Sequence, residues 1–139
     1  MTPSTLAPPG ASELLHTVDV QAVEPWFPTS VMLTAGERYF FRAWGNWFDW
    51  GTQHNANGEP QPKLDKFLPY IRCKAPGATW FTLIGAVDKD RDSFFPIGDG
   101  LRWPDGWVAP ASGQLRCFAN DVRIMYFNNT GAVTLQVWR

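Results

Sequence analysis

Cysteine, histidine and charge are all scarce in this chain. Its 139 residues include two cysteines and two histidines, and only 18% of them are charged. Zinc signatures need a denser set of Cys and His, and a disulfide framework needs more cysteines. Both cysteines lie in predicted strands, where Cys commonly packs as a small hydrophobe. We therefore expect Cys73 and Cys117 to be reduced core thiols, and a bridge between them is the alternative.

The distribution of charge argues against two further classes of protein. The formal net charge is −1 and no cluster of Lys and Arg occurs, so the basic stripe that binds nucleic acid is missing. No apolar run approaches the roughly 20 residues that cross a bilayer, so we expect no membrane insertion. The first ten residues lack the charged and apolar regions of a signal peptide. A cytoplasmic location is the default expectation, and export by a signal-less route stays open.

Helical periodicity is almost absent, and short alternating segments predict strands. Only residues 11–16 have a pattern that could form a helical turn. The alternating segments are separated by Gly, Pro, Asn and Asp at the spacing typical of β-sandwiches. The predicted strands are 17–23, 30–33, 38–43, 70–73, 79–87, 114–120 and 132–138. The predicted fold class is all-β, a sandwich of about eight short antiparallel strands. Residues 1–16 are expected to be a flexible lead-in, and residues 17–139 the single domain.

Two long polar segments, 51–63 and 88–106, interrupt the predicted strands. Loops of this length in compact domains often carry function. The run Asp88-Lys89-Asp90-Arg91-Asp92 imitates the start of an EF-hand calcium loop. It lacks the Gly at the sixth position, has Asp99 in place of Glu at the twelfth, and is not flanked by predicted helices. We therefore interpret this run as a solvated loop.

Aromatic residues are unusually common, with eight Trp, ten Phe and three Tyr. Such residues favour strands, and they also form the walls of carbohydrate and peptide sites. A ring face can stack on a ligand while the ring edge hydrogen-bonds. Most of these rings are expected to pack in the core or on the sheets, so their number alone does not locate a site.

The most informative motif lies near the C-terminus. Asn120-Asp121 ends one predicted strand, and Asn128-Asn129-Thr130-Gly131 leads into the next. Because the two ends of a hairpin loop lie close together, the Asp121 carboxylate and the two carboxamides can meet. Oxygen ligands with one full negative charge suit a hard cation such as Ca²⁺ and leave room for a neutral ligand. The alternative is that Asn-Asn-Thr-Gly only makes the turn, since Asn and Gly tolerate positive φ.

Enzymatic motifs are weak by comparison. Nothing resembles a P-loop or a dinucleotide fingerprint, and His54 has no Ser-containing elbow or Cys nearby. We predict no catalytic residues. A small hydrolase that uses His54 with Asp49 or Asp65 is the weakest of three hypotheses.

Several segments resemble one family of known proteins. The closest is 113–137, where a strand ends in Asn-Asp and is followed by a short loop, Asn-Asn-Thr-Gly and an alternating final strand. Segments 27–37, 43–45, 83–85 and 95–98 match as well. Together they resemble the small bacterial galactophilic, calcium-dependent lectins known as PA-I-like or LecA-like lectins. The resemblance implies a galactose-binding-domain-like β-sandwich of the jelly-roll type over residues 17–139.

The resemblance also implies a calcium site. The metal would be held by the side chains of Asp121, Asn128 and Asn129 and by the main-chain carbonyls of Met125 and Trp50. Two adjacent sugar hydroxyls would replace water on the cation, while the Asp and Asn side chains hydrogen-bond the same hydroxyls.

The implied sugar-binding set is Asp121, Asn128 and Asn129 together with Trp50, Gln53 and His54. An aromatic ring would pack on the apolar face of the sugar. The His and Gln of the family align near Lys66 and Pro69, whereas Gln53 and His54 supply these residue types elsewhere in the loop.

One loop departs from the family pattern, and it separates the first two hypotheses. The segment 122–127 is bulky and apolar where the family has a small, Gly-containing loop, and Arg123 adds a cation. The first hypothesis is a calcium-dependent lectin for galactose or a related glycan. Because single-site affinity would be modest, it is expected to act as a homo-oligomer. The second hypothesis is a non-catalytic interaction module in which 122–127 is an exposed interface.

Overall fold

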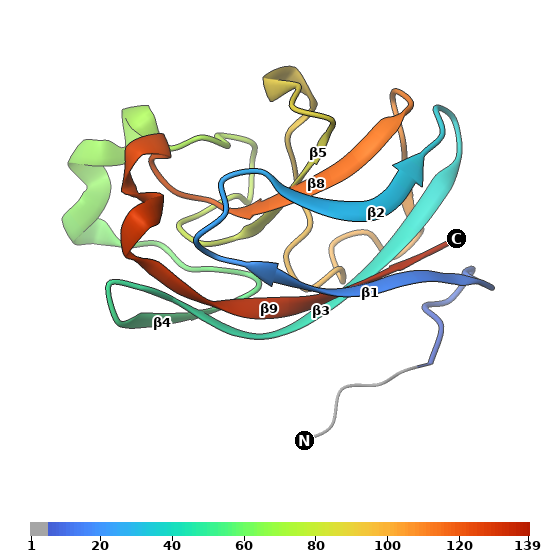
Figure 1. The fold of residues 1–139 in the computed structure, drawn as a ribbon, viewed down its shortest axis with the longest axis horizontal. Coiled ribbons are helices and arrows are strands. Elements are labelled where there is room, and N and C mark those ends of the chain that lie inside the picture. Colours follow the sequence, from blue (N-terminus) through green and yellow to red (C-terminus); the bar gives the residue numbers. More distant parts are fainter. Residues whose placement is uncertain (1–5) are drawn as a thin grey trace.

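The computed structural model describes residues 6–139 and has two antiparallel sheets packed face to face (Figure 1). The predicted all-β sandwich is therefore confirmed, with nine strands in the described part of the chain. Residues 1–5 of the expected lead-in lie outside the described residues, and residues 14–16 already belong to the first strand. Among residues 6–139, no helix has the length and apolar character needed to cross a membrane.

The first sheet has the strand order β1-β9-β3-β4, with the short β7 on β3, and the second has the order β2-β8-β5-β6. The strands of the first sheet are β1 (Leu14–Gln21), β3 (Arg38–Asp49), β4 (Thr52–Asn55), β7 (Trp107–Val108) and β9 (Asn129–Trp138). Those of the second are β2 (Phe27–Leu33), β5 (Leu83–Val87), β6 (Phe95–Pro96) and β8 (Gly113–Ala119). Three 3₁₀ helices connect them: η1 (Pro62–Tyr70), η2 (Arg91–Ser93) and η3 (Arg123–Asn128).

The core lies between the two sheets and follows the alternation of the strands. Val133, Leu135 and Val137 of β9 are fully buried, as their spacing of two residues predicts. Cys117 on β8 faces the same core, and Cys73 belongs to a smaller cluster with Phe118. Both thiols are free and buried, which agrees with the expectation of reduced core cysteines.

Three local predictions are wrong. Residues 11–16 make no helical turn, because β1 begins at Leu14 and pairs there with Trp138. Residues 70–73 form only an isolated bridge, between Ile71 and Val122, and residues 79–82 are not part of β5. In the latter segment Phe81 has φ of 64°, a left-handed conformation that no strand adopts.

Strand β3 is twice as long as predicted and reaches into the expected polar loop. It pairs with β9 from Phe40 to Asp49, and this continuous ladder carries it past the predicted end. The turn Trp50-Gly51 then joins it to β4, with φ values of 48° and 85°. Positive φ at both positions is the signature of the tight turns that fit a twisted hairpin. Trp is an unusual choice for the first of them.

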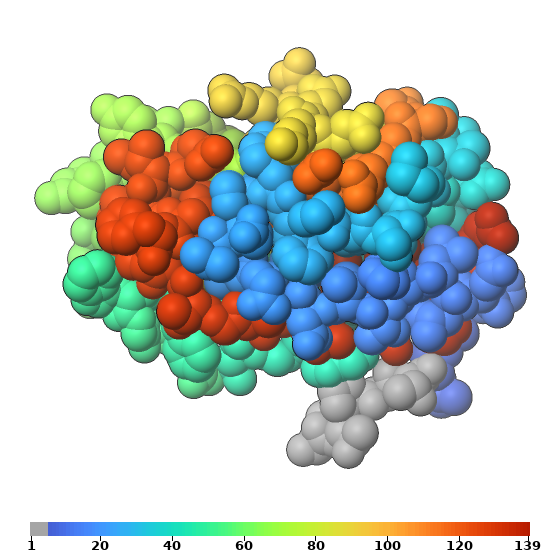
Figure 2. Space-filling view, viewed as in Figure 1, coloured from blue at the N-terminus to red at the C-terminus, as the bar shows by residue number. Residues whose placement is uncertain are grey.

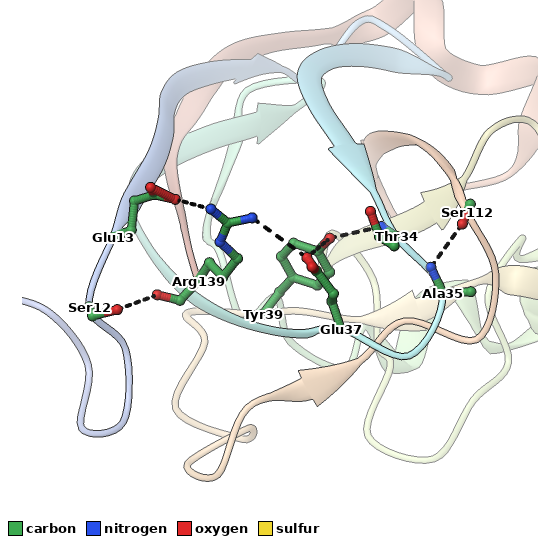
Figure 3. A network of polar contacts seen from close by, with 8 residues as sticks. All are labelled: Ser12, Glu13, Thr34, Ala35, Glu37, Tyr39, Ser112 and Arg139. Atoms are coloured by element: carbon green, nitrogen blue, oxygen red, sulfur yellow. Dashed lines mark hydrogen bonds and ion pairs between the residues drawn. The ribbon is translucent and has the colours of Figure 1, made fainter.

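The C-terminal residue and the segment at the start of β1 meet at one end of the sandwich. Arg139 pairs with Glu13 at 2.6 Å and lies 3.7 Å from Glu37, whose carboxylate accepts a hydrogen bond from the Tyr39 hydroxyl (Figure 3). The 3₁₀ helices η1 and η3 lie at the opposite end (Figure 1). The candidate site is found there.

Candidate functional site

A pocket of about 820 Å³ opens where the β3–β4 turn, η1 and η3 converge. In the space-filling view, η1 in light green and η3 in red lie against each other at this end of the molecule (Figure 2). The pocket is lined by Asp49, Trp50, Thr52, Gln61, Lys63, Leu64, Phe67, Tyr70, Trp80, Asp121, Val122, Arg123, Ile124, Met125 and Asn128.

The fully buried carboxamide of Asn120 fixes the inner wall of this pocket. Its Oδ1 accepts a hydrogen bond from the main-chain N–H of Cys73 at 2.9 Å. Its Nδ2 donates to the carbonyls of Cys73 at 2.9 Å and Thr79 at 3.1 Å. The main chain of Asn120 also accepts a hydrogen bond from the N–H of Phe81 at 2.8 Å. These hydrogen bonds hold residues 73–81, which include Trp80, against the end of β8. Asp121 is the next residue after Asn120.

The structure brings Asp121 and Asn129 together as their spacing predicted. Nδ2 of Asn129 donates to Oδ2 of Asp121 at 3.1 Å and to the carbonyl of Ala22 at 3.2 Å. Oδ1 of Asp121 accepts a hydrogen bond from the N–H of Val122 at 2.7 Å. Asp121 is only 3% exposed, yet it contributes to the lining of the pocket.

Two carboxamide oxygens at this site have no hydrogen-bond partner. Oδ1 of Asn128 and Oδ1 of Asn129 are buried and accept no hydrogen bond within residues 6–139. An unpaired buried acceptor costs on the order of 1–3 kcal/mol, so such atoms are rare without a reason. Both residues belong to the predicted set of metal ligands.

Asp49 is a second carboxylate at the site, and the sequence analysis did not assign it there. It is the last residue of β3 and pairs in register with Asn129. Its side chain is half-buried and has no hydrogen-bond or ion-pair partner in the described part of the chain. Burial raises the pKa of Asp49. In the sequence, only its position next to Trp50 indicates a role for Asp49 here, because the resemblance implies that the Trp50 carbonyl binds the cation.

Burial of Asp121 makes its negative charge unfavourable. Desolvation raises the pKa of Asp121 to about 6, although the hydrogen bonds from Val122 and Asn129 oppose the shift. The charge on Asp49 raises this pKa further. The charge on Arg72 lowers the pKa of Asp121, and His54 lowers that of Asp49, but neither carboxylate has an ion-pair partner within residues 6–139. Two carboxylates and two unpartnered carboxamide oxygens therefore form an electron-rich site.

The two residues predicted to offer main-chain carbonyls also reach the pocket. Trp50 is 76% exposed, and its N–H donates to the carbonyl of Asn128 at 3.1 Å, which ties the β3–β4 turn to η3. Met125 lies on η3 and lines the same pocket. No group of three or more His, Cys, Asp or Glu side chains suitable for a metal occurs in residues 6–139. A cation here would depend on carboxamide and main-chain oxygens besides the two carboxylates.

Helix η3 is anchored by one buried side chain. The Tyr126 hydroxyl donates to the carbonyl of Ala119 at 2.5 Å and accepts a hydrogen bond from Nη1 of Arg72 at 2.8 Å. The Arg72 guanidinium lies 3.6 Å from the centroid of the Phe118 ring and 4.6 Å from that of Trp26. These contacts fix the position of the apolar loop even though most of its side chains face outward.

The structure does not bring Gln53 and His54 into the pocket. In the β3–β4 hairpin His54 lies opposite Trp47, so its ring points into the core and stacks on Phe81 at 4.9 Å. His54 is 3% exposed, its Nδ1 lies 3.1 Å from Oε1 of Glu59, and burial lowers its pKa. Gln53 is exposed on β4 and is not among the residues that line the pocket. Thr52 and Gln61 supply polar groups in their place.

Part of the pocket could not be found from the sequence. Leu64, Phe67 and Tyr70 come from η1, a 3₁₀ helix in a segment without periodicity. Trp80 is 3% exposed, lines the pocket, and has an indole Nε1 without a hydrogen-bond partner in the described chain. No local pattern marks it among eight Trp residues.

Comparison with known proteins gives a structural likeness. The chain superposes on a solved structure described as "EclA N-terminal domain; PllA-like lectin" with a TM-score of 0.63 and 20% sequence identity. The match covers 91% of this chain and 98% of that chain. The two chains share a fold. No family model and no curated protein matches the sequence, so membership of the PA-I-like family stays a prediction.

We predict that Asp121→Asn stabilises the chelator-stripped protein at pH 7. The variant keeps the shape of the side chain and removes a charge that burial disfavours, which should raise the free energy of unfolding by up to roughly 3 kcal/mol. The gain is reduced because the Asn129 carboxamide, which now donates to Asp121 and Ala22, must flip to accept a hydrogen bond from the new amide. Above pH 6 the Asp121 carboxylate is ionised in both the folded and the unfolded protein, so the burial of its charge destabilises the wild type fully. Between about pH 6 and pH 3.8 the folded protein binds a proton at Asp121 while the unfolded protein does not, so this destabilisation becomes smaller. The gain should therefore shrink between pH 7 and pH 4.5.

Urea unfolding in the presence of EDTA at both pH values measures this effect. Asp105→Asn is the matched control, because Asp105 is exposed and does not line the pocket. A stability difference between the variant and the wild type that does not fall between pH 7 and pH 4.5 would contradict the assignment of a carboxylate whose charge is disfavoured by burial.

Proposed function

We propose that this chain is a non-catalytic carbohydrate-binding protein, a lectin, whose sugar site is the pocket between the β3–β4 turn, η1 and η3. We further propose that binding depends on Ca²⁺. The observation that supports the proposal is a group of oxygens at the pocket. The carboxylates of Asp49 and Asp121 line it and have no ion-pair partner within residues 6–139. Asn128, which also lines it, and Asn129, which is hydrogen-bonded to Asp121, have buried carboxamide oxygens without a partner in the same part of the chain.

The residues present fit a calcium ion. The side chains of Asp121, Asn128 and Asn129 would hold it together with the carbonyls of Trp50 and Met125, and Asp49 adds a second carboxylate beside them. Hard oxygen ligands of mixed charge are the set that Ca²⁺ prefers. When bound, the ion supplies a fixed positive charge that accepts the oxygens of two neighbouring sugar hydroxyls.

The remaining residues of the pocket would orient and enclose the sugar. The exposed indole of Trp50 can stack on the apolar face of the ring, a contact typical of carbohydrate sites. The unpartnered Nε1 of Trp80 is a donor at the pocket wall, and Asp121 and Asn128 supply acceptors. Small-molecule sites usually combine a few polar groups, which orient the ligand, with apolar groups that enclose it.

Galactose or a related glycan is the sugar that we propose to test first. The support is the sequence resemblance over 113–137, together with the lectin description of the structural neighbour. We also propose a homo-oligomer, because a pocket with few polar contacts gives modest single-site affinity and several sites together give avidity.

We predict that Ca²⁺ raises the melting temperature of chelator-stripped protein and is needed for sugar binding. Saturation to about 100 times Kd should add roughly 2.7 kcal/mol, equivalent to a rise of roughly 5–15 °C. Differential scanning calorimetry measures the first effect. Isothermal titration with methyl α-galactoside and methyl α-mannoside, each with Ca²⁺ or EDTA, measures the second and tests the preference for galactose.

Two variants make this test specific. Asp121→Asn should abolish the calcium shift, whereas Asp105→Asn should leave it unchanged. If Ca²⁺ produces no shift in the wild type, the calcium dependence is wrong. If neither that pair of sugars nor a wider glycan panel binds in the presence of Ca²⁺, the lectin assignment is wrong.

A separate prediction concerns the strained turn at Trp50. Trp50→Asn creates an Asn-Gly turn, the preferred sequence for positive φ at both positions, and should raise stability by about 0.5–1 kcal/mol. It also removes the stacking surface, which should weaken sugar binding on the order of tenfold. Trp50→Tyr keeps an aromatic face and should retain most of the affinity. Equal sugar affinity in wild type and Trp50→Asn would remove Trp50 from the site.

A further inference from the structure

Exposed apolar side chains gather at the pocket end of the molecule. Thirteen large hydrophobic side chains are exposed within residues 6–139. Seven of them lie on the β3–β4 turn, η1 and η3, and we refer to them as the apolar rim: Trp50, Phe67, Leu68, Tyr70, Ile124, Met125 and Phe127. Ile124 is 79% exposed and Phe127 70% exposed. Exposed apolar surface is costly in water, so a concentration of this kind marks a contact surface.

Hydrogen bonds fix two of the three segments that carry the apolar rim. Helix η3 is fixed through the Tyr126 hydroxyl, and the β3–β4 turn is fixed through the hydrogen bond from Trp50 N–H to the Asn128 carbonyl. Trp50, Phe67, Tyr70, Ile124 and Met125 line one pocket, and the other rim residues belong to the same 3₁₀ helices, so the rim lies beside a single opening. Figure 2 shows η1 and η3 exposed next to each other at this end. The rim is therefore a preformed surface.

Cations are interleaved with the apolar rim. Lys63 and Lys66 lie on η1, and Arg123 lies on η3. All three are exposed, and none has an ion-pair partner in the described part of the chain. Asp65 is the one acidic residue of η1, and η3 has none.

The acidic residues of the pocket do not cancel this charge at its mouth. Asp121 is buried and Asp49 is half-buried, so both lie below the rim. The outermost surface therefore combines apolar side chains with an excess of positive charge.

We propose that this end of the molecule docks on the surface of an anionic lipid bilayer. Apolar and aromatic side chains next to Lys and Arg form the combination that binds the boundary between headgroups and acyl chains. Only side chains need to enter the bilayer, so a segment long enough to span it is not required. A second copy of the chain fits less well, because a two-fold contact through this face would bring Lys63, Lys66 and Arg123 toward the same cations of the partner copy.

The proposal goes beyond carbohydrate binding and does not depend on it. Docking in this orientation would turn the pocket mouth toward the membrane, so that sugars carried on lipids would be presented to the site. Because the lipids used for the test carry no sugar and the buffer contains EDTA, failure of the calcium or sugar predictions would leave this test unaffected.

The experiment is vesicle co-sedimentation with two lipid compositions. The wild-type chain should bind vesicles of phosphatidylcholine containing roughly one-third phosphatidylserine, bind pure phosphatidylcholine vesicles at least tenfold more weakly, and be released by high salt. Ile124→Ser combined with Phe127→Ser should lower the partition coefficient on the order of tenfold. Lys63→Gln and Arg123→Gln should each lower it roughly fivefold on the anionic vesicles.

The matched control removes two exposed apolar side chains elsewhere on the surface. Met32 on β2 and Leu101 after β6 are 66% and 62% exposed and lie outside the rim, so Met32→Ser with Leu101→Ser should bind vesicles like the wild type. Equal loss in this control, or no binding of the wild type to anionic vesicles, would overturn the proposal. If sedimentation velocity without lipid shows an oligomer that Ile124→Ser with Phe127→Ser dissociates, the surface joins copies of the chain and the proposal is likewise wrong.

Discussion

The buried carboxamide of Asn120 is the interaction on which the site depends. With its side chain and main chain it binds Cys73, Thr79 and Phe81, and so holds the irregular segment 73–81 against the end of β8. That segment carries Trp80 to one wall of the pocket, while the next residue, Asp121, forms its base. A polar group can be buried at low cost only when its hydrogen-bonding capacity is used, and Asn120 uses both its donor and acceptor. The hydrogen bonds of Asn120 therefore fix the irregular segment of the site to the end of a strand in the sandwich.

The site itself contains several features that oppose folding. Asp49 and Asp121 are carboxylates whose ionised forms are disfavoured by burial, and Asn128 and Asn129 hold unpartnered oxygens. Trp50 adopts a left-handed conformation and exposes its indole. Strain and unpaired polar groups persist where the surrounding structure enforces them, and they concentrate at functional sites. These features occur together at one pocket, and their coincidence supports the proposed ligand site more strongly than any single residue does.

The sequence predicted the regular parts of this structure and one half of the site. Alternation in 132–138 and the turn residues between segments are local signals, so the sandwich and the pairing of Asp121 with Asn129 across a short loop could both be anticipated. Asp49 could not be placed, because the predicted strand ended at residue 43 and the ladder with β9 that extends it is a tertiary effect. His54 was misplaced for a related reason, since hairpin register decides which face a side chain occupies. Trp80 is positioned by long-range hydrogen bonds of Asn120 to residues 73–82, and η1 lies in a segment without periodicity, so no sequence pattern indicates this wall.

The most direct test of the central claim is terbium luminescence. Tb³⁺ binds the same kinds of oxygen ligand as Ca²⁺, and Trp50 and Trp80 line the pocket where they would transfer excitation energy to it. A cation site at these residues should give sensitised, saturable emission when Trp is excited, and Ca²⁺ or the variant Asp121→Asn should abolish it. Absence of sensitised emission from the wild type, or equal emission from Asp121→Asn, would contradict a cation site at these residues.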